Sequence, residues 1–221
     1  MSSIKTLISA GGKCGIERDI LNEEYKYLIG VDSGITHLYR LFFQPTHLVG
    51  DLDSISERDL ERARKDEAIF IELSPDKNRT DLEAAYDLAL ELDSEEIILI
   101  GGEEGDVDQL FGILLLCASF ASKIKTTWIQ NEYSIYFQNE ITLNIDSGKM
   151  FSVIAISDLK NVIIQGAKWN IDRELVLTGS SKTLRNESIG DEIKIKIDFL
   201  ILFSENVYLT WSLYAYSIPL I

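Results

Sequence analysis

The chain has 221 residues, a mass of 25.0 kDa and a formal net charge of −15, from 36 acidic and 21 basic residues. Nucleic acids and anionic membranes are bound mainly through Lys and Arg, so this charge argues against both as partners. Hydrophobic residues make up 46% of the chain, which favours a packed core and excludes a disordered protein. The length suits one large domain or two modest ones.

The first residues and the cysteines bear on the compartment. Residues 1–12 lack the basic and long apolar segments of a secretory signal, and no apolar run reaches the roughly 18 residues of a membrane span. Cys14 and Cys117 lie far apart, which predicts neither a disulfide framework nor a thiolate metal site. We therefore expect a cytoplasmic protein without a membrane partner.

Short apolar runs alternate with amphipathic segments in the first half, a pattern typical of βα units around a mostly parallel sheet. The predicted strands are Thr6 to Ser9, Tyr27 to Val31, His47 to Gly50, Ile69 to Leu73 and Ile97 to Ile100. The predicted helices are Ile35 to Phe43, Glu57 to Lys65, Thr80 to Leu92 and Gln109 to Ala121. The last helix is apolar on nearly every side, which indicates a place in the core or at an interface, with Cys117 as a core residue.

The pattern changes after about residue 126, where helical periodicity disappears. Strand-like runs follow at Thr126 to Gln130, Ile135 to Phe137, Phe151 to Ile156, Glu174 to Leu177, Glu192 to Ile197 and Val207 to Trp211. Their spacing and the turn signals between them are typical of an antiparallel sandwich or barrel. We therefore divide the chain into an α/β domain, residues 1–127, and an all-β domain, residues 128–221.

Two carboxylates follow the third predicted strand, in Gly50-Asp51-Leu52-Asp53-Ser54. Alternate residues of extended backbone point the same way, so Asp51 and Asp53 can reach one cation. Ligands of open α/β folds bind at the carboxyl edge of the sheet. Mg²⁺ takes one or two carboxylates together with nucleotide phosphates, so this segment predicts a magnesium site.

Further carboxylates follow other predicted strands. Asp32 comes after the second strand, Asp81 after the fourth and Asp108 after the fifth. Each one alone has a simpler explanation, because Asp is common in turns and Thr80 or Asp81 could serve only as a helix cap. Together they would repel one another at one edge unless a cation neutralised them, which favours a metal bound to polyphosphate. The P-loop and dinucleotide glycine motifs are absent from the sequence.

Several blocks resemble the motifs of the thiamine pyrophosphokinase family. They are Val31-Asp32-Ser33-Gly34-Ile35-Thr36-His37-Leu38, Gly50-Asp51-Leu52-Asp53-Ser54, Arg79-Thr80-Asp81, Gly105-Asp106-Val107-Asp108-Gln109 and Gly166-Ala167-Lys168-Trp169-Asn170-Ile171, followed by Gly179 and Asn186-Glu187. The family patterns are A-D-G-G-x-N-x-L, G-D-x-D-S, K-T-D, G-G-R-x-D-[HQ] and G-x-K-W-x-L, followed by a glycine and S-N-E. Their order and spacing match, so the resemblance spans nearly the whole chain.

The resemblance implies an α/β domain for nucleotide and metal, a β-sandwich domain, and a homodimer whose thiamine site combines both domains. The reaction it implies is transfer of diphosphate from ATP to the hydroxyl of thiamine, which attacks the β-phosphorus in line and releases AMP. The implied catalytic residues and Mg²⁺ ligands are Asp51, Asp53 and Asp81. The implied nucleotide and phosphate contacts are Asp32, Thr80, Asp108 and Gln109, and the implied substrate contacts are Trp169, Arg185 and Asn186.

Trp169 would stack on the cationic thiazolium of thiamine, because an indole face attracts cations. Without the resemblance, a Trp in a sandwich strand is better explained as a core residue. His37 and His47 are both expected to be structural.

Four positions depart from the family pattern. Asp106 replaces an Arg that would contact phosphate, and Asn78, Ile113 and Arg185 replace an Asp, a polar residue and a Ser. The missing positive charge could come from Lys77, Arg79 or Lys168. Two alternatives therefore stay open: a diphosphotransferase acting on another hydroxymethyl compound such as a pterin, and a non-catalytic protein that binds thiamine or nucleotide. Retention of the three predicted metal ligands favours catalysis.

Overall fold

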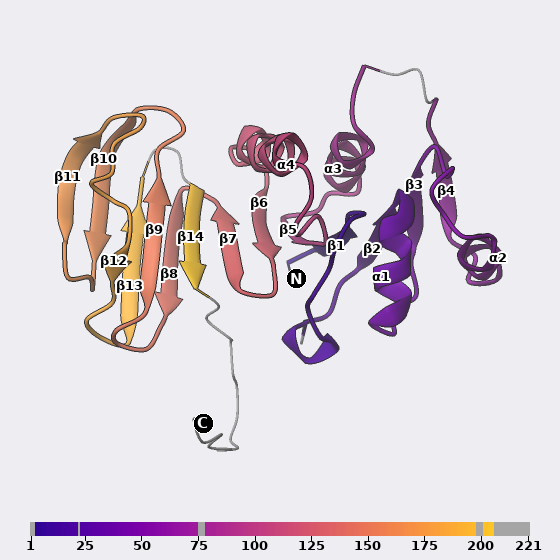
Figure 1. Ribbon diagram of the computed structural model, residues 1–221, viewed down its shortest axis with the longest axis horizontal. Coiled ribbons are helices and arrows are strands. Elements are labelled where there is room, and N and C mark those ends of the chain that lie inside the picture. The colour runs from indigo at the N-terminus through magenta and orange to yellow at the C-terminus, as the bar shows by residue number, and fades with distance from the viewer. Residues whose placement is uncertain (1–2, 22, 75–77, 198–200, 206–221) are drawn as a thin grey trace.

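The computed structural model describes residues 3–21, 23–74, 78–197 and 201–205 (Figure 1). The first half alternates strands and helices. The strands are β1 (Lys5–Ser9), β2 (Tyr27–Val31), β3 (His47–Gly50), β4 (Ile69–Glu72) and β5 (Glu96–Ile100). The helices are α1 (Ile35–Arg40), α2 (Glu57–Lys65), α3 (Asp81–Glu91) and α4 (Val107–Phe120), with short 3-10 turns η1 (Arg18–Ile20) and η2 (Asp32–Gly34).

The second half is built from strands alone within the described residues. They are β6 (Lys125–Ile129), β7 (Tyr133–Phe137), β8 (Glu140–Asn144), β9 (Met150–Ile154), β10 (Leu159–Gln165), β11 (Ile171–Val176), β12 (Asn186–Glu187), β13 (Glu192–Lys196) and β14 (Ile201–Glu205). The predicted strand Val207 to Trp211 lies outside the described residues.

One large sheet runs through both halves. Its order over the described residues is β12-β9-β14-β7-β6-β5-β1-β2-β3-β4. From β4 to β6 the strands are parallel, and from β7 onward they pair antiparallel. The antiparallel part faces a second sheet of order β11-β10-β13-β8, and the two form the sandwich at the left of Figure 1.

Apolar alternation explains both layers. In the sandwich, Phe151 and Val153 of β9 point at Val162 and Ile164 of β10 in one buried cluster, as the period of two in strands requires. In the parallel part, α3 and α4 cover one face of the sheet through a core that includes Tyr86. The predicted fold class, an α/β half with a mostly parallel sheet followed by a β-sandwich, is confirmed.

The helix ends follow from capping. Ser56 and Thr80 precede α2 and α3, and their side chains accept hydrogen bonds from the backbone N–H groups of Asp59 and Glu83. Thr80 therefore stands before its helix, whereas the sequence pattern placed it within the helix. The predicted domain boundary at 127/128 falls inside β6, and the division into two domains stays a prediction.

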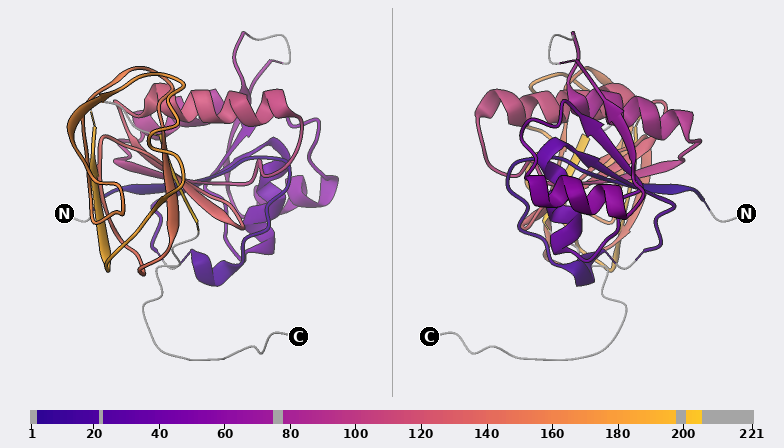
Figure 2. Two further views of the ribbon diagram at one scale, coloured as in Figure 1. Left: turned by 60° about the vertical axis from the view of Figure 1, so that its left-hand side comes forward. Right: turned by 90° about the vertical axis from the view of Figure 1, so that its right-hand side faces the viewer.

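Helix α4 has two different faces. Cys117, Ala118 and Phe120 are buried in the core, as the sequence predicts for Cys117. Phe111 and Leu115 are more than half exposed. Figure 2 shows α4 lying across the top of the large sheet. In the described part of the chain, no helix is both long and apolar enough to cross a membrane.

Candidate active site

The ends of β2 and β3 bring Asp32 to the backbone of the segment that contains Asp51. Val31 pairs with Val49, so Asp32 stands opposite Gly50. A Cβ at Gly50 would lie 1.7 Å from Asp32 Oδ1, which means that the carboxylate rests on the glycine. Asp32 Oδ1 also accepts a 3.4 Å hydrogen bond from the Leu52 N–H. The carboxylate thus lies along residues 50–52, beside Asp51.

Asp51 and Asp53 continue this edge. The Asp51 side chain accepts a hydrogen bond of 3.3 Å from the Asp53 N–H, which folds the loop into a tight turn. Asp51 is half-buried and Asp53 is exposed. The loop is therefore ordered by its own carboxylate while Asp53 faces solvent.

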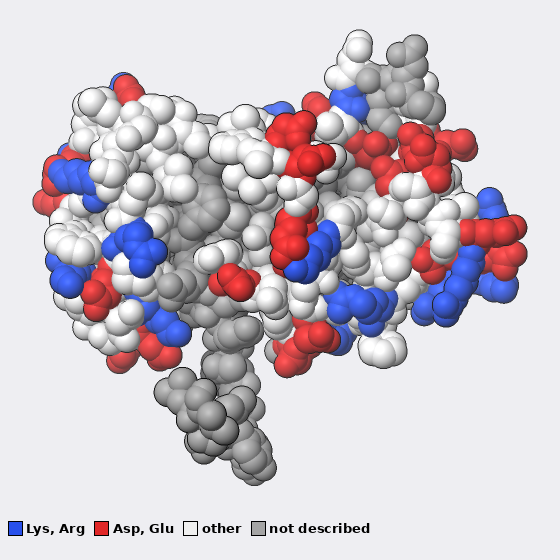
Figure 3. Space-filling view, in the orientation of Figure 1, with Lys and Arg blue, Asp and Glu red and all other residues white. Residues whose placement is uncertain are grey.

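Helix α3 begins at the same edge. It follows the carboxyl end of β4 and leads back to the amino end of β5, so Thr80 and Asp81 at its first turn lie on the side where Asp32 and Asp51 lie. Thr80 Oγ1 accepts a 3.2 Å hydrogen bond from the Glu83 N–H, which makes it the helix cap. Figure 3 shows acidic side chains gathered over the ends of β3 and β4.

The first turn of α4 carries the fourth predicted acidic block. Asp106 precedes the helix, and Asp108 and Gln109 lie in its first turn; all three are exposed. The loop before them follows the carboxyl end of β5, two strands away from β2. Ile113, another departure from the family pattern, packs against Gly102 of this loop.

A buried carboxylate that the sequence did not single out ties the neighbouring loops together. Glu103 is 6% exposed, and its oxygens accept hydrogen bonds from Gly15 N–H at 3.1 Å and Asn131 N–H at 3.2 Å. It therefore joins the loops after β1, β5 and β6. Its neighbour Glu104 is exposed and pairs with Lys13. The sequence shows two adjacent Glu residues and carries no signal that tells which of them is buried.

His37 and His47 have the structural roles expected of them. His37 Nε2 donates a 2.8 Å hydrogen bond to the carbonyl of Gly12, which fixes the loop after β1 against α1. Burial lowers the pKa of His37, and the Gly12 carbonyl opposes that change. His47 contacts Tyr27 edge to face, and burial lowers its pKa as well.

The donor chemistry of this edge suits Mg²⁺, although the carboxylates do not form a ready-made cage. No three His, Cys, Asp or Glu side chains converge as metal ligands anywhere in the described residues, so Asp51, Asp53 and Asp81 do not meet around one point. Mg²⁺ keeps several waters and commonly takes one or two carboxylates plus substrate phosphates. Asp32 and Asp51, on adjacent strand ends, fit that requirement.

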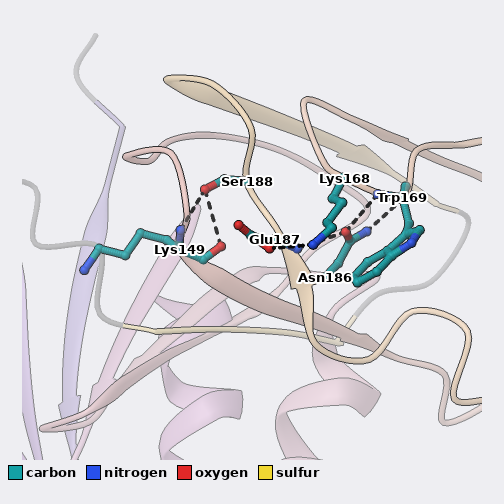
Figure 4. A network of polar contacts seen from close by, with 6 residues as sticks. All are labelled: Lys149, Lys168, Trp169, Asn186, Glu187 and Ser188. Atoms are coloured by element: carbon teal, nitrogen blue, oxygen red, sulfur yellow. Dashed lines mark hydrogen bonds and ion pairs between the residues drawn. The ribbon is translucent and has the colours of Figure 1, made fainter.

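The second predicted group lies in the sandwich, in the turn between β10 and β11 and in β12. Trp169 is 54% exposed, so it is not the core residue that its strand context suggests. Asn186 is buried, and its amide bonds to the backbone of Trp169 (Figure 4). Arg185 is exposed, and its N–H donates to Ser152 Oγ at 2.9 Å.

The basic residues considered as substitutes for the missing Arg are engaged elsewhere or undescribed. Arg79 pairs with Asp87 at 3.0 Å. Lys168 pairs with Glu187 at 3.2 Å, within the sandwich. Lys77 lies outside the described residues.

The two groups are far apart within one chain. Seven strand-to-strand steps of the large sheet separate β12, which holds Asn186, from β2, which leads to Asp32. At a spacing of about 4.8 Å a step, the path across the sheet between the two strands is roughly 34 Å. One substrate cannot contact both groups of the same chain.

The fold and the acidic edge define an α/β phosphotransferase class: a parallel sheet whose carboxyl edge suits a metal and a polyphosphate, joined to a β-sandwich. The family model described as thiamin pyrophosphokinase, catalytic domain, matches residues 19–129. The thiamine pyrophosphokinase of Bacillus subtilis (strain 168) is 30% identical over 194 residues, which cover 84% of this chain and 91% of that protein. The chain belongs to the thiamine pyrophosphokinase family.

Solved structures agree with this assignment. The crystal structure of thiamine pyrophosphokinase from Bacillus subtilis superposes with a TM-score of 0.79 at 26% identity, over 92% of this chain and 99% of that one. Yeast thiamin pyrophosphokinase shares the fold, with a TM-score of 0.74 at 17% identity over 93% of this chain and 87% of that one. The protein is therefore a diphosphotransferase, and neither the pterin-type nor the non-catalytic alternative is favoured.

Proposed function

We propose that the protein transfers a diphosphate from ATP to the hydroxyl of thiamine in a Mg²⁺-dependent reaction, giving thiamine diphosphate and AMP. The observation that carries the proposal is the packing of the Asp32 carboxylate along the Asp51 loop in a chain of this family. Carboxylates on two adjacent strand ends are the oxygen donors that a Mg²⁺ ion bound to a polyphosphate takes from a protein.

In this proposal, Asp32 and Asp51 contact the metal directly, Asp53 and Asp81 act at the same edge through its bound waters and the polyphosphate, and Thr80, Asp108 and Gln109 lie near the nucleotide phosphates. Bound Mg²⁺ would neutralise charge on the transferred diphosphate and the leaving AMP. The chain's own contribution is positioning: adjacent strand ends and the start of α3 fix where the polyphosphate lies relative to the acceptor hydroxyl. Trp169 and Arg185 would contact thiamine, the acceptor of the diphosphate.

We also infer that the working unit is a homodimer located in the cytoplasm. Because a path of roughly 34 Å across the sheet separates β2 from β12, to which the Trp169 turn is bonded, we infer that Trp169 of a second copy completes the site. An apolar stripe on α4 is suited to such a contact: Val107, Phe111 and Leu115 follow one another at four-residue spacing and are 68%, 56% and 55% exposed. A helix stripe of this kind can pair with its own copy across a two-fold axis.

The test is AMP release from ATP and Mg²⁺, with and without thiamine. We expect thiamine-dependent AMP from the wild type and a loss of about 100-fold or more in Asp53→Ala, the size seen when one stabiliser of transition-state charge is removed. Asp191→Asn, an exposed acidic residue of the sandwich, is the matched control and should keep full activity. AMP release that does not depend on thiamine, or an Asp53→Ala variant with full activity, would contradict the proposal.

A further inference from the structure

Trp169 is held in place through its backbone. The Asn186 amide oxygen accepts hydrogen bonds from the Trp169 N–H at 3.2 Å and the Glu187 N–H at 2.9 Å, and its NH₂ group donates to the Trp169 carbonyl at 2.8 Å. Asn186 is only 2% exposed. The oxygen and the nitrogen of this buried side chain are both bonded to backbone groups. Asn186 therefore stabilises the local backbone and is a poor candidate for contacting substrate.

The rest of the turn is tied to β12 as well. The Lys168 N–H donates to the Glu187 carbonyl at 2.8 Å, and Ala167 pairs with Ser188 as an isolated bridge. The segment that presents Trp169 is thus joined to β12 along three successive residues. The Trp169 side chain extends from this turn beside Lys168 and Asn186 (Figure 4). Trp169 is more than half exposed.

A cation and an anion flank the indole. Lys168 Nζ lies 5.1 Å from the centroid of the Trp169 ring and 3.2 Å from Glu187 Oε2. The carboxylate of Glu187 is thus paired with an ammonium that lies against the indole, and a cationic ring that takes the place of this ammonium would meet the same carboxylate. The ammonium already makes the kind of cation–π contact that a cationic ring would make.

We propose that Asn186 is a positioning residue that presets Trp169 as a platform for a flat cationic ring, and that Glu187 supplies the negative charge that favours a cationic over a neutral ring. The proposal rests on the proposed function for the identity of the ring, and it replaces the direct substrate contact that the family resemblance implied for Asn186. An exposed aromatic ring fixed in advance binds more tightly because its ordering entropy is not lost on binding.

The first test is equilibrium binding of thiamine, monitored by quenching of tryptophan fluorescence. The chain has three tryptophans, so the part of the quenching that is absent in Trp169→Phe is assigned to Trp169. In Asn186→Ala we expect binding to weaken about three- to ten-fold, the effect of having to order one free side chain. We also expect the anisotropy of the Trp169 emission to fall in the unliganded protein. Asn144→Ala, an exposed position on β8, is the control and should change neither.

Anisotropy separates positioning from direct contact. If thiamine binding weakens while the anisotropy stays at the wild-type value, Asn186 contacts the substrate and the positioning role is wrong. Unchanged binding together with unchanged anisotropy would also overturn it. Because Asn186 is buried, thermal unfolding of the variant is measured first. If Asn186→Ala does not fold, Asn186→Asp replaces it with the same two readouts, since it keeps the acceptor for the Trp169 N–H and loses the donor to the Trp169 carbonyl.

Glu187→Gln tests whether the negative charge of Glu187 favours a cationic ring. The side chain is partly exposed, and Gln can still accept the hydrogen bond from Lys168. We expect thiamine to bind about three- to ten-fold more weakly, as removal of one charge several ångströms away in a solvated site implies. A neutral thiamine analogue with thiophene in place of thiazolium should bind equally to both proteins. Glu140→Gln, in the exposed pair with Lys196, is the control.

Equal weakening for the charged and the neutral ring, or no weakening for either, would overturn the role of Glu187. Binding does not require turnover, so these results are independent of AMP release. A protein that binds thiamine on this platform and releases no AMP would refute the proposed function and leave the platform intact.

Discussion

The substitution Gly50→Ala tests the position of the Asp32 carboxylate without changing any acidic residue. Gly50 has φ of +146°, and an added Cβ would lie 1.7 Å from Asp32 Oδ1 and 2.5 Å from Asp32 Cγ. Both distances are far inside van der Waals contact, so the Asp32 side chain must leave its position. It then loses the hydrogen bond from the Leu52 N–H.

Two costs add up in this variant. The backbone conformation is unfavourable for any side chain and costs about 1–3 kcal/mol of stability. Gly105 offers a measure of that cost alone, because its φ is +144° and an added Cβ there meets nothing within 4 Å. We expect Gly50→Ala to lower the free energy of unfolding by about 1 kcal/mol or more beyond Gly105→Ala, through the displaced carboxylate and its lost hydrogen bond.

The assays are urea unfolding for stability and thiamine-dependent AMP release for function. Activity should fall about ten-fold or more in Gly50→Ala, because a metal ligand displaced by an ångström or more no longer holds the polyphosphate in place. In an Asp32→Ala background, where the obstructing carboxylate is gone, adding Gly50→Ala should cost only the backbone strain. Equal stability of the two glycine variants together with full activity would refute the reasoning.

Three further predictions follow from particular contacts. Burial holds the pKa of His37 below its unfolded value of about 6.5, so protonation favours the unfolded state and stability falls as pH drops below that value. His37→Gln keeps an Nε2 donor and should flatten the decline in unfolding free energy between pH 7 and 5; an unchanged slope would contradict this. Thr80→Ala should cost about 1 kcal/mol through loss of the α3 cap, as should Ser56→Ala at α2, and a change in the KM for ATP in the first alone would indicate a phosphate contact. Phe111→Asp should convert a dimer to monomers in sedimentation velocity by placing a charge in the apolar stripe of α4, whereas Phe42→Asp, at another exposed Phe, should not.

The elements of the first half could be predicted closely because each is coded locally. Tyr27–Val31, His47–Gly50 and Glu57–Lys65 have the bounds expected from their apolar spacing and turn residues. In the second half, β8, β10, β12 and β14 escaped prediction. Strands of a sandwich are short, and β12 has only two residues, so the pairing partner rather than the segment itself decides that they are strands.

The acidic edge was foreseeable in outline, since parallel strands of alternating βα units end on the same side of a sheet. The order of strands and helices alone therefore predicts that Asp32, Asp51 and Asp81 lie at one edge. The helix cap at Thr80 was also one of the explanations that the sequence offered, and it is confirmed. The contact of Asp32 with Gly50 was not predictable, because it depends on side-chain directions fixed by neighbouring strands and turns.

The sequence by itself determined the family, the α/β-then-β architecture and the residue types of the site, because these reside in local periodicity and short motifs. Tertiary structure alone decided that Glu103 is buried while Glu104 is exposed, and that Asn186 holds Trp169. It also decided that the two halves of the site stand at opposite ends of one sheet. Burial and partnership of a polar side chain depend on segments distant in sequence, and a local pattern carries no information about them.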